Sequence, residues 1–434
     1  MKDVARLAFP AFGVLVAEPL YLLYDFAVVG RLGALALAGL AIGGTVLALV
    51  STQLTFLSYG TTARAARLHG AGDERGAVGE GVQATWVALG VGAALTVVMQ
   101  LLAAPVVSVL ADDPQVADAA VGWLRIGLFG VPLLLIAMAG NGWLRGVQNT
   151  VLPLVYVVAG LLVSAVLCPI LVHGTGLGMR GSAVANLAGQ AITAVLFVGA
   201  LVARRVPLRP VPSIMWAQLR LGRDLIARSL AFQVCFVSAT AVAARFGAAA
   251  VAAHQMVLNL WFFSALTLDA LAIAAQSLVG AALGAGDTVA ARTLAWRITW
   301  WSTAFSGALA LVFAAGYAVV PRIFTGDTAV LVETGHAWWF FVAILPLGGV
   351  AFALDGVLIG AGDAAFLRTA TLLSALVGFL PLIWAALIFD WGLAGIWAGL
   401  AAFMVLRALS VVARTRSGHW LVTGADRQRV KVES

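Results

Sequence analysis

Long, uninterrupted runs of apolar residues dominate the chain and set its predicted architecture. Each run is at least as long as the roughly 20 residues that a helix needs to cross a hydrocarbon core of about 30 Å. A transmembrane β-barrel would show short alternating segments instead. We therefore predict an all-α polytopic membrane protein, with twelve transmembrane helices at residues 7–29, 35–59, 82–104, 119–141, 151–172, 179–203, 222–244, 249–275, 295–319, 333–357, 368–389 and 393–414.

The second half of the chain repeats the first at a constant offset of 214 residues. Residues 31–34 (Arg-Leu-Gly-Ala) return as 245–248 (Arg-Phe-Gly-Ala), and residues 70–73 (Gly-Ala-Gly-Asp) return unchanged as 284–287. Six spans per half is an even number, so both halves enter the membrane in the same direction and form parallel repeats. We expect two six-helix lobes around a central cavity, which is the architecture of an alternating-access transporter.

The boundary between the lobes is predicted at a segment rich in arginine and proline. Pro207, Pro210 and Pro212 interrupt the apolar pattern there, between the sixth and seventh spans. We accordingly expect an N-terminal lobe at 1–203, a cytoplasmic linker at 204–222, a C-terminal lobe at 223–417 and a cytoplasmic tail at 418–434.

Composition and charge fix the environment and the orientation. Hydrophobic residues make up 62% of the chain and charged residues only 10%, which excludes a soluble protein of this size. With the N-terminus in the cytoplasm, 21 of the 26 Lys and Arg residues lie inside, as the positive-inside rule requires. We expect a bacterial inner-membrane protein with both termini cytoplasmic. Its net charge of +7 is explained by cytoplasmic loops that lie against anionic membrane lipids, so we expect no nucleic-acid partner.

The polar motifs of the chain are predicted to be structural. Gly-Ala-Gly-Asp occurs at 70–73, 284–287 and 360–363, where glycines end one helix and Asp caps the next. The only lysines are Lys2 and Lys431, so a nucleotide-binding P-loop is impossible and transport must draw on an ion gradient. No HExxH motif or Cys/His cluster is present, and we expect neither an enzyme nor a cofactor or metal.

Several sequence segments resemble the multidrug and toxic compound extrusion (MATE) transporters, and in particular the DinF-like branch. They are Glu-Pro-Leu-Tyr-Leu-Leu-Tyr-Asp at 18–25, Val-Gly-Arg-Leu-Gly at 29–33, Ala-Ala-His-Gln at 252–255, residues 268–276 and Leu-Asp-Gly at 354–356. The resemblance extends from about residue 3 to 417. It implies two six-helix lobes and the export of organic, often cationic, compounds against an inward flow of protons or sodium ions.

Asp25 is the principal candidate for the coupling residue. A carboxyl group inside a span usually lines a cavity or takes up a proton, because its ionised form is expensive in hydrocarbon. The resemblance implies that Asp25 couples ion binding to export and that Pro10 lets the first helix bend. Glu18 lies seven residues earlier, on roughly the same helix face. The alternative is that Asp25 sits near the outer end of its span and only reaches interfacial water.

The chain departs from the family pattern beside Asp25. Many relatives carry an Asn and an Asp in the fifth span, which with the first-span Asp form a cation site; here Ser164 and Cys168 take those places. Asn186 stands at the matching threonine position of the sixth span. Since sodium requires several oxygen ligands and a thiol is a poor one, we favour protons as the coupling ion. Sodium coupling stays the alternative.

The C-terminal lobe contributes two carboxyl groups inside spans. Asp269 lies in the eighth span and Asp355 in the tenth, at the repeat position of Asn141. These groups either face the central cavity and attract a cationic substrate, or join helices through hydrogen bonds. Candidates for the apolar wall of the cavity are Tyr21, Tyr24, Gln53, Met138, Met256 and Asn259. Trp300, Trp301, Trp338 and Trp339 fall at predicted span ends and are expected to be interfacial anchors.

The function predicted from these features is secondary active export. We expect a monomeric antiporter that exports amphipathic, cationic, drug-like organic compounds and is driven by protonation of Asp25. A flippase for lipid-linked precursors would need several cationic side chains inside the cavity, and the spans carry almost none. An intramembrane enzyme lacks its motifs, and a channel does not explain two parallel lobes.

Overall fold

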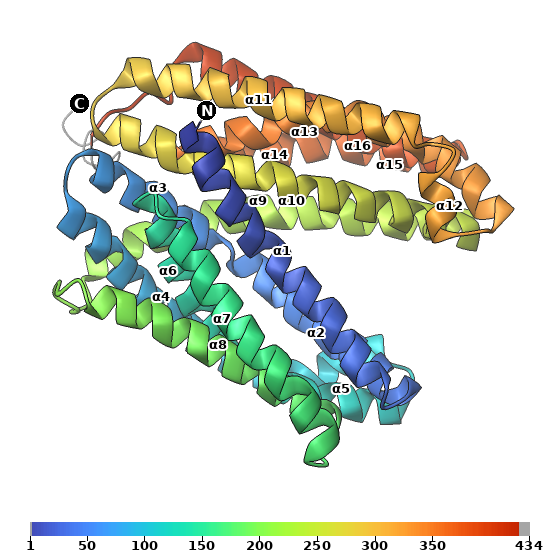
Figure 1. The fold of residues 1–434 in the computed structure, drawn as a ribbon. Coiled ribbons are helices and arrows are strands. Elements are labelled where there is room, and N and C mark those ends of the chain that lie inside the picture. Colours follow the sequence, from blue (N-terminus) through green and yellow to red (C-terminus); the bar gives the residue numbers. More distant parts are fainter. Residues whose placement is uncertain (1, 425–434) are drawn as a thin grey trace. The chain divides into compact units, whose positions relative to one another are not determined.

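The computed structural model describes residues 2–424, and every regular element in that range is a helix (Figure 1). The chain divides into two compact units. The N-terminal unit comprises residues 5–222, and the C-terminal unit comprises residues 223–424 together with residues 2–4. The part of the predicted tail from residue 425 onward lies outside the described residues.

The N-terminal unit contains six membrane-crossing elements. Its helices α2 and α3 form one continuous span, and α7 continues into the short π-helix η1. Its elements are α1 (Lys2–Gly30), α2 (Ala34–Leu54), α3 (Phe56–Gly70), α4 (Glu74–Leu110), α5 (Pro114–Gly127), α6 (Gly130–Gly146), α7 (Val151–Pro169), η1 (Ile170–Gly174) and α8 (Met179–Val202).

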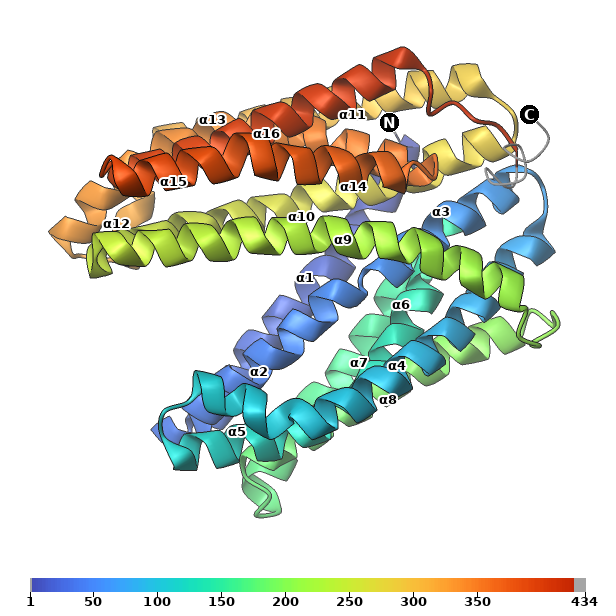
Figure 2. The ribbon, with the colours of Figure 1, turned by 180° about the vertical axis from the view of Figure 1, so that it is seen from behind.

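The C-terminal unit also contains six membrane-crossing elements. Helices α15 and α16 run side by side in it (Figure 2). Its elements are α9 (Pro212–Ala243), η2 (Ala244–Phe246), α10 (Ala248–Gly284), α11 (Thr288–Ala315), α12 (Val320–Phe324), α13 (Thr328–Gly360), α14 (Ala364–Leu373), η3 (Ser374–Phe379), α15 (Leu380–Ile388) and α16 (Gly392–Ser417).

The prediction of an all-α protein with twelve spans is confirmed over the described residues. Eleven helices are long and apolar enough to cross a membrane. Helices α5 and α6 meet at an angle of 46° and together supply a twelfth span. The predicted fourth span at 119–141 is therefore broken at residues 128–129, between α5 and α6.

The sequence repeat is also a repeat of backbone geometry. Gly33 and Gly247, which precede α2 and α10, have φ angles of 111° and 106°. Only glycine adopts such angles readily, so both halves require glycine at this turn. Asp73 and Asp287 cap α4 and α11 in the same way, each accepting a 2.8 Å hydrogen bond from the amide three residues later.

The third Gly-Ala-Gly-Asp motif differs in its last residue. Gly362 makes the same left-handed turn with φ of 72°. Asp363, however, accepts a 2.8 Å hydrogen bond from Arg414 Nε instead of capping α14 with its side chain. The turn prediction therefore holds for all three motifs, and the capping prediction is wrong for one of them.

Close helix packing is repeated as well. A Cβ atom at Gly142 on α6 would collide with the carbonyl group of Ser58 on α3. A Cβ atom at Gly356 on α13 would collide with the carbonyl group of Ala272 on α10, and both residues are shifted by the same 214 positions. Glycine at these points lets two helix backbones approach each other inside each unit, as is usual for membrane helices.

The predicted linker packs tightly against the N-terminal unit. The Gln83 side chain on α4 donates to Arg209 O at 2.9 Å and accepts from Val211 N at 2.7 Å. Trp86 Nε1 donates to Leu208 O at 2.8 Å, and Gln218 Nε2 donates to Glu80 at 2.8 Å. Residues 204–222 thus follow one face of α4, and the division between the units comes after them.

One expected anchor is part of the core. Trp338 is fully buried and donates to Phe313 O at 3.2 Å, so its prediction as an interfacial residue is wrong. Trp300, Trp301 and Trp339 are exposed as expected. Adjacent helical residues point about 100° apart, which lets α13 bury Trp338 while Trp339 stays exposed.

Candidate functional site

The candidate site lies where α1 meets α7 and α8 within the N-terminal unit. Ser164 bonds Tyr21, Tyr24 donates to Ala165 O at 2.9 Å, and Cys168 bonds Asp25. The residue numbers of the paired positions increase in the same order on both helices, so α1 and α7 run in the same direction along this contact. The spacing of three to four residues keeps Tyr21, Tyr24 and Asp25 on one side of α1.

Asp25 is buried, with only 2% of its surface exposed. Ser182 Oγ on α8 donates to its Oδ2 at 2.8 Å, and Cys168 Sγ donates to its Oδ1 at 3.2 Å. Ser182 in turn accepts from Trp123 Nε1 at 3.3 Å. Among the residues that the structure describes, no cation pairs with Asp25. The alternative that Asp25 merely reaches interfacial water does not fit this burial.

These neighbours can serve both charge states of the carboxyl group. A serine hydroxyl rotates, so Ser182 can donate to the carboxylate or accept from the neutral acid. A thiol is a weaker partner in either direction. No fixed positive charge holds the group in its ionised form. The arrangement can therefore gain and lose a proton without leaving a buried group unpaired.

Several residues expected beside Asp25 are placed elsewhere. Ser164 bonds Tyr21 instead of the carboxyl group. Asn186 accepts from Gln190 at 3.4 Å, and the contact expected from it is made by Ser182, one helical turn earlier. Glu18 is exposed, unlike Asp25, and has no hydrogen bond or ion pair within residues 2–424. The same helix face therefore carries a buried acid and an exposed one.

Sequence reasoning missed Ser182 and Trp123. The sixth-span position was assigned by resemblance, and a shift of four residues along a helix keeps nearly the same face while moving the contact by about 6 Å. The polar spacing of Ser182, Asn186 and Gln190, each four residues apart, could have indicated a polar stripe on that span.

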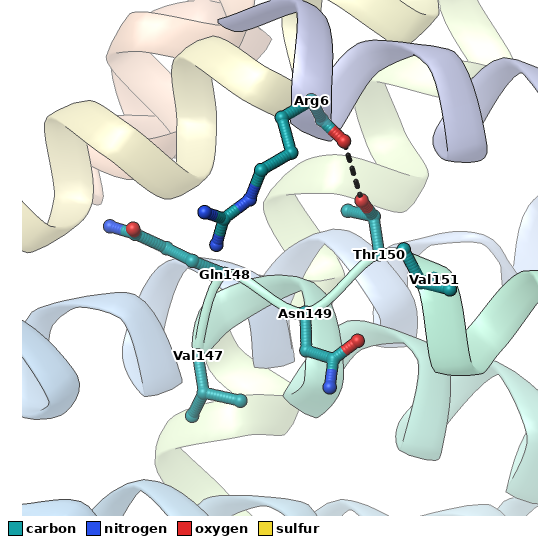
Figure 3. Close-up of a pocket in the computed structure, with 6 residues that line it drawn as sticks. All are labelled: Arg6, Val147, Gln148, Asn149, Thr150 and Val151. Atoms are coloured by element: carbon teal, nitrogen blue, oxygen red, sulfur yellow. Dashed lines mark hydrogen bonds between the residues drawn. The ribbon is translucent and has the colours of Figure 1, made fainter. Parts of the chain in front are cut away.

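Pro10 lies inside α1, which continues without a break from Lys2 to Gly30. Since proline has no N–H group, the carbonyl of Arg6 loses its helical partner. Thr150 Oγ1, at the turn before α7, lies 3.5 Å from that oxygen (Figure 3). Arg6 and residues 147–151 line a cavity of about 360 Å³ here. The helix is therefore weakened at Pro10 and supported from outside by Thr150.

Asp355 is neutralised by two arginines of its own unit. Arg228 on α9 contacts Asp355 Oδ2 at 2.6 Å, and Arg407 on α16 contacts the same oxygen. Both guanidinium groups lie over the ring of Phe232, at 5.5 and 4.5 Å. The expectation that Asp355 attracts a cationic substrate is therefore wrong, and the alternative of joining helices is correct. The expectation that the spans carry almost no cations is wrong as well.

The repeat partner of Asp355 is in a different state. Asn141 is buried, and its Oδ1 has no hydrogen-bond partner within the described residues. The remaining candidates are divided between the two units. Asp269 is half-buried in α10, and among the predicted cavity residues Gln53 and Met138 are half-buried, Met256 is buried, and Tyr24 and Asn259 are exposed. Their common cavity stays a prediction.

Comparison with known proteins gives consistent matches over both halves of the chain. The MatE family profile matches residues 10–170 and again 225–384. Protein DETOXIFICATION 44, chloroplastic, of Arabidopsis thaliana is 32% identical, with 96% of this chain and 83% of that protein covered. DNA damage-inducible protein F of Escherichia coli (strain K12) is 30% identical, with 96% and 92% covered.

Solved structures show the same fold. A crystal structure of MATE in the bent conformation superposes with a TM-score of 0.89 at 22% identity, covering 96% of this chain and 95% of that one. The outward-facing conformation of a multidrug resistance MATE family transporter gives a TM-score of 0.86, also at 22% identity, with the same coverage of 96% and 95%. The shared fold includes the helices that carry the site around Asp25.

Proposed function

Because the chain belongs to the MatE family of multidrug and toxic compound transporters, we propose that it is a proton-driven exporter in which Asp25 carries the coupling proton. The observation that supports this proposal most directly is the environment of Asp25: a buried carboxyl group with neutral partners only. We place the protein in a bacterial inner membrane and expect it to work as a monomer.

Protonation would change how α1 is held. In the ionised state, the carboxylate accepts from α7 through Cys168 and from α8 through Ser182. Taking up a proton removes the charge and converts one accepting oxygen into a donor, so the bond at that oxygen must reverse and the other bond loses its charged acceptor. Since α1 is weakened at Pro10, the helix can respond by bending there. Proton binding is thereby coupled to the shape of α1.

The groups at Asp25 that could bind a cation favour a proton over sodium. They are one carboxyl group, one hydroxyl oxygen and one thiol sulfur. A hard cation prefers several oxygen ligands, whereas a proton needs a single carboxylate. Sodium coupling would require further oxygens to approach Asp25 from positions that they do not hold here.

The substrate is proposed to be an amphipathic organic cation. Glu18 supports this class, because it is an exposed acid on α1 with no ion pair within residues 2–424. Asp355 does not support it, since Arg228 and Arg407 already neutralise that group. A lipid pyrophosphate is disfavoured, because the two arginines share one carboxylate and leave a single net positive charge.

Proton release from the purified protein tests this function. Linkage requires that a substrate which competes with the proton displaces it on binding. Adding cationic dyes in weak buffer is expected to release roughly one proton per bound dye from the wild type and none from Asp25→Asn. Equal release from both proteins would assign the coupling proton to another group.

A further inference from the structure

A second pocket lies within the N-terminal unit, at the opposite end of α1 from Asp25. It has a volume of about 330 Å³ and is formed by the start of α4, the end of α6 and the first residues of the linker. Its polar lining consists of Glu74, Arg75, Trp143 and Arg204, and three valines complete the wall. None of these residues takes part in the proposed proton site.

Trp143, in the wall of this pocket, carries an unsatisfied hydrogen-bond donor. The residue is only 1% exposed, and its Nε1 has no hydrogen-bond partner within the described residues. Gly81 on α4 allows the indole to sit there, because a Cβ at that position would come within 2.9 Å of the Trp143 side chain. A buried N–H group without a partner is costly, which indicates that an acceptor belongs beside it.

The charges around the pocket favour a singly negative acceptor. The Arg204 guanidinium lies over the Trp143 ring, 6.0 Å from its centroid, and Arg75 lines the same space. Glu74 is the opposing acid, and His69 Nδ1 contacts its carboxylate at 2.5 Å. Two arginines and one glutamate leave a net charge of +1. A phosphodiester carries one negative charge and accepts hydrogen bonds from arginine and from an indole N–H.

The surroundings of the pocket have the composition of a membrane interface. The linker beside it exposes Leu208 and Trp216 together with Arg205 and Arg209. Exposed apolar and aromatic side chains among arginines are typical of segments at the level of lipid headgroups. Hydrogen bonds to Gln83 and Trp86 hold residues 208–211 of the linker against α4.

We propose that this pocket binds the phosphodiester group of a membrane phospholipid. Arg75 and Arg204 contact its two free oxygens, Trp143 Nε1 donates to one of them, and the valine wall contacts the glycerol backbone. The ligand fixes the linker against α4. The site is independent of the proposed proton chemistry, so Asp25→Asn is expected to bind the lipid as the wild type does.

Native mass spectrometry of the full-length protein in detergent tests the proposal, with dioleoyl phosphatidylglycerol as the probe. Dioleoylglycerol has the same acyl chains without the phosphate, and inorganic phosphate has the anion without the lipid. The wild type is expected to retain one phosphatidylglycerol molecule. The Arg75→Gln/Arg204→Gln protein should bind it about tenfold more weakly, as expected for lost charge-assisted hydrogen bonds.

Two further variants make the result specific to the pocket. Arg205→Gln/Arg209→Gln removes the same charge from exposed linker positions outside the pocket and should weaken binding less than about twofold. Trp143→Phe keeps the ring but removes the N–H donor, and should weaken binding about fivefold. Equal loss in both arginine pairs, or equal retention of dioleoylglycerol, would overturn the proposal. Inorganic phosphate that displaces the lipid completely would overturn the assignment to a membrane source.

Discussion

Asp25 and Asp355, a buried carboxyl group from each unit, have strongly different surroundings. Asp25 is 2% exposed and Asp355 is 3% exposed, so burial does not distinguish them. Asp25 has a hydroxyl and a thiol as partners, whereas Asp355 has two guanidinium groups. Burial disfavours the ionised form of any carboxyl group, and fixed positive charges reverse that preference. The partners therefore distinguish the two acids: Asp355 is ion-paired and Asp25 has neutral partners.

This difference places a charged triad in one unit and a carboxyl group among neutral partners in the other. The Asp355 triad joins α9, α13 and α16 and stabilises the C-terminal unit. The Asp25 contacts join α1 to α7 and α8 and can be rearranged by one proton. The two repeats thus share a backbone plan but have separate roles.

The largest effect on stability is expected from breaking the triad. Asp355→Leu leaves Arg228 and Arg407 without their shared carboxylate, and removing one partner of a buried ion pair destabilises by about 3–5 kcal/mol. Chemical unfolding in detergent measures the loss. The Asp355→Leu/Arg407→Met protein leaves one fewer charge unpaired and should recover part of it. A double variant no more stable than the single one would show that the triad is not held by charge.

An intermediate effect is expected from Ser182→Ala. The variant removes the stronger donor to Asp25, and a hydrogen bond to a charged group contributes about 1.5–3 kcal/mol in favour of the ionised form. Proton binding strengthens, so the pH of half-maximal transport should rise by about one unit. Transport by proteoliposomes over a pH series measures the shift. An unchanged profile would mean that Ser182 does not sense the charge of Asp25.

A smaller effect of opposite sign is expected from Cys168→Ser. Replacing the thiol with a hydroxyl gives the carboxylate a stronger donor, so the same pH midpoint should fall by about half a unit. Cys235→Ser is the matched control, because this buried cysteine occupies the repeat position of Tyr21 and contacts no described acid. A midpoint that shifts equally in both variants would point to a general loss of packing.

No effect is expected from removing sodium. Replacing it with choline at constant pH should leave the export rate of the wild type unchanged, because the oxygens around Asp25 are too few for a hard cation. Collapse of export would identify sodium as the coupling ion. That result would keep Asp25 as the coupling residue but would make sodium, instead of a proton, the ion that it binds.

The sequence predicted the features that depend on local pattern. Apolar runs defined the twelve spans, and the glycines at positions 33 and 247 marked equivalent turns, because span length and left-handed backbone are local requirements. The partners of the carboxyl groups could not be predicted in this way. Arg228 and Arg407 lie 127 and 52 residues from Asp355 in the chain.

Contacts of this kind depend on how helices rotate and pair. Ser182 and Asn186 lie on the same face of α8, and only the vertical position of α8 against α1 selects Ser182 as the partner of Asp25. The rotation of α13 turns Asp355 toward α9 and α16. The residue pattern along one helix specifies neither its rotation nor its position along a neighbouring helix. The sequence therefore identified Asp25 and Asp355 as intramembrane carboxyl groups but did not identify Ser182, Arg228 or Arg407 as their partners.

The most direct test of the central claim is uphill dye export by Asp25→Asn in proteoliposomes with an imposed pH gradient. Asparagine keeps the size of the carboxyl group and the one donor and one acceptor of its neutral form, but cannot exchange a proton. The variant is expected to fold and insert like the wild type and to export no dye against its gradient. Export at the wild-type rate would contradict the assignment of the coupling proton to Asp25.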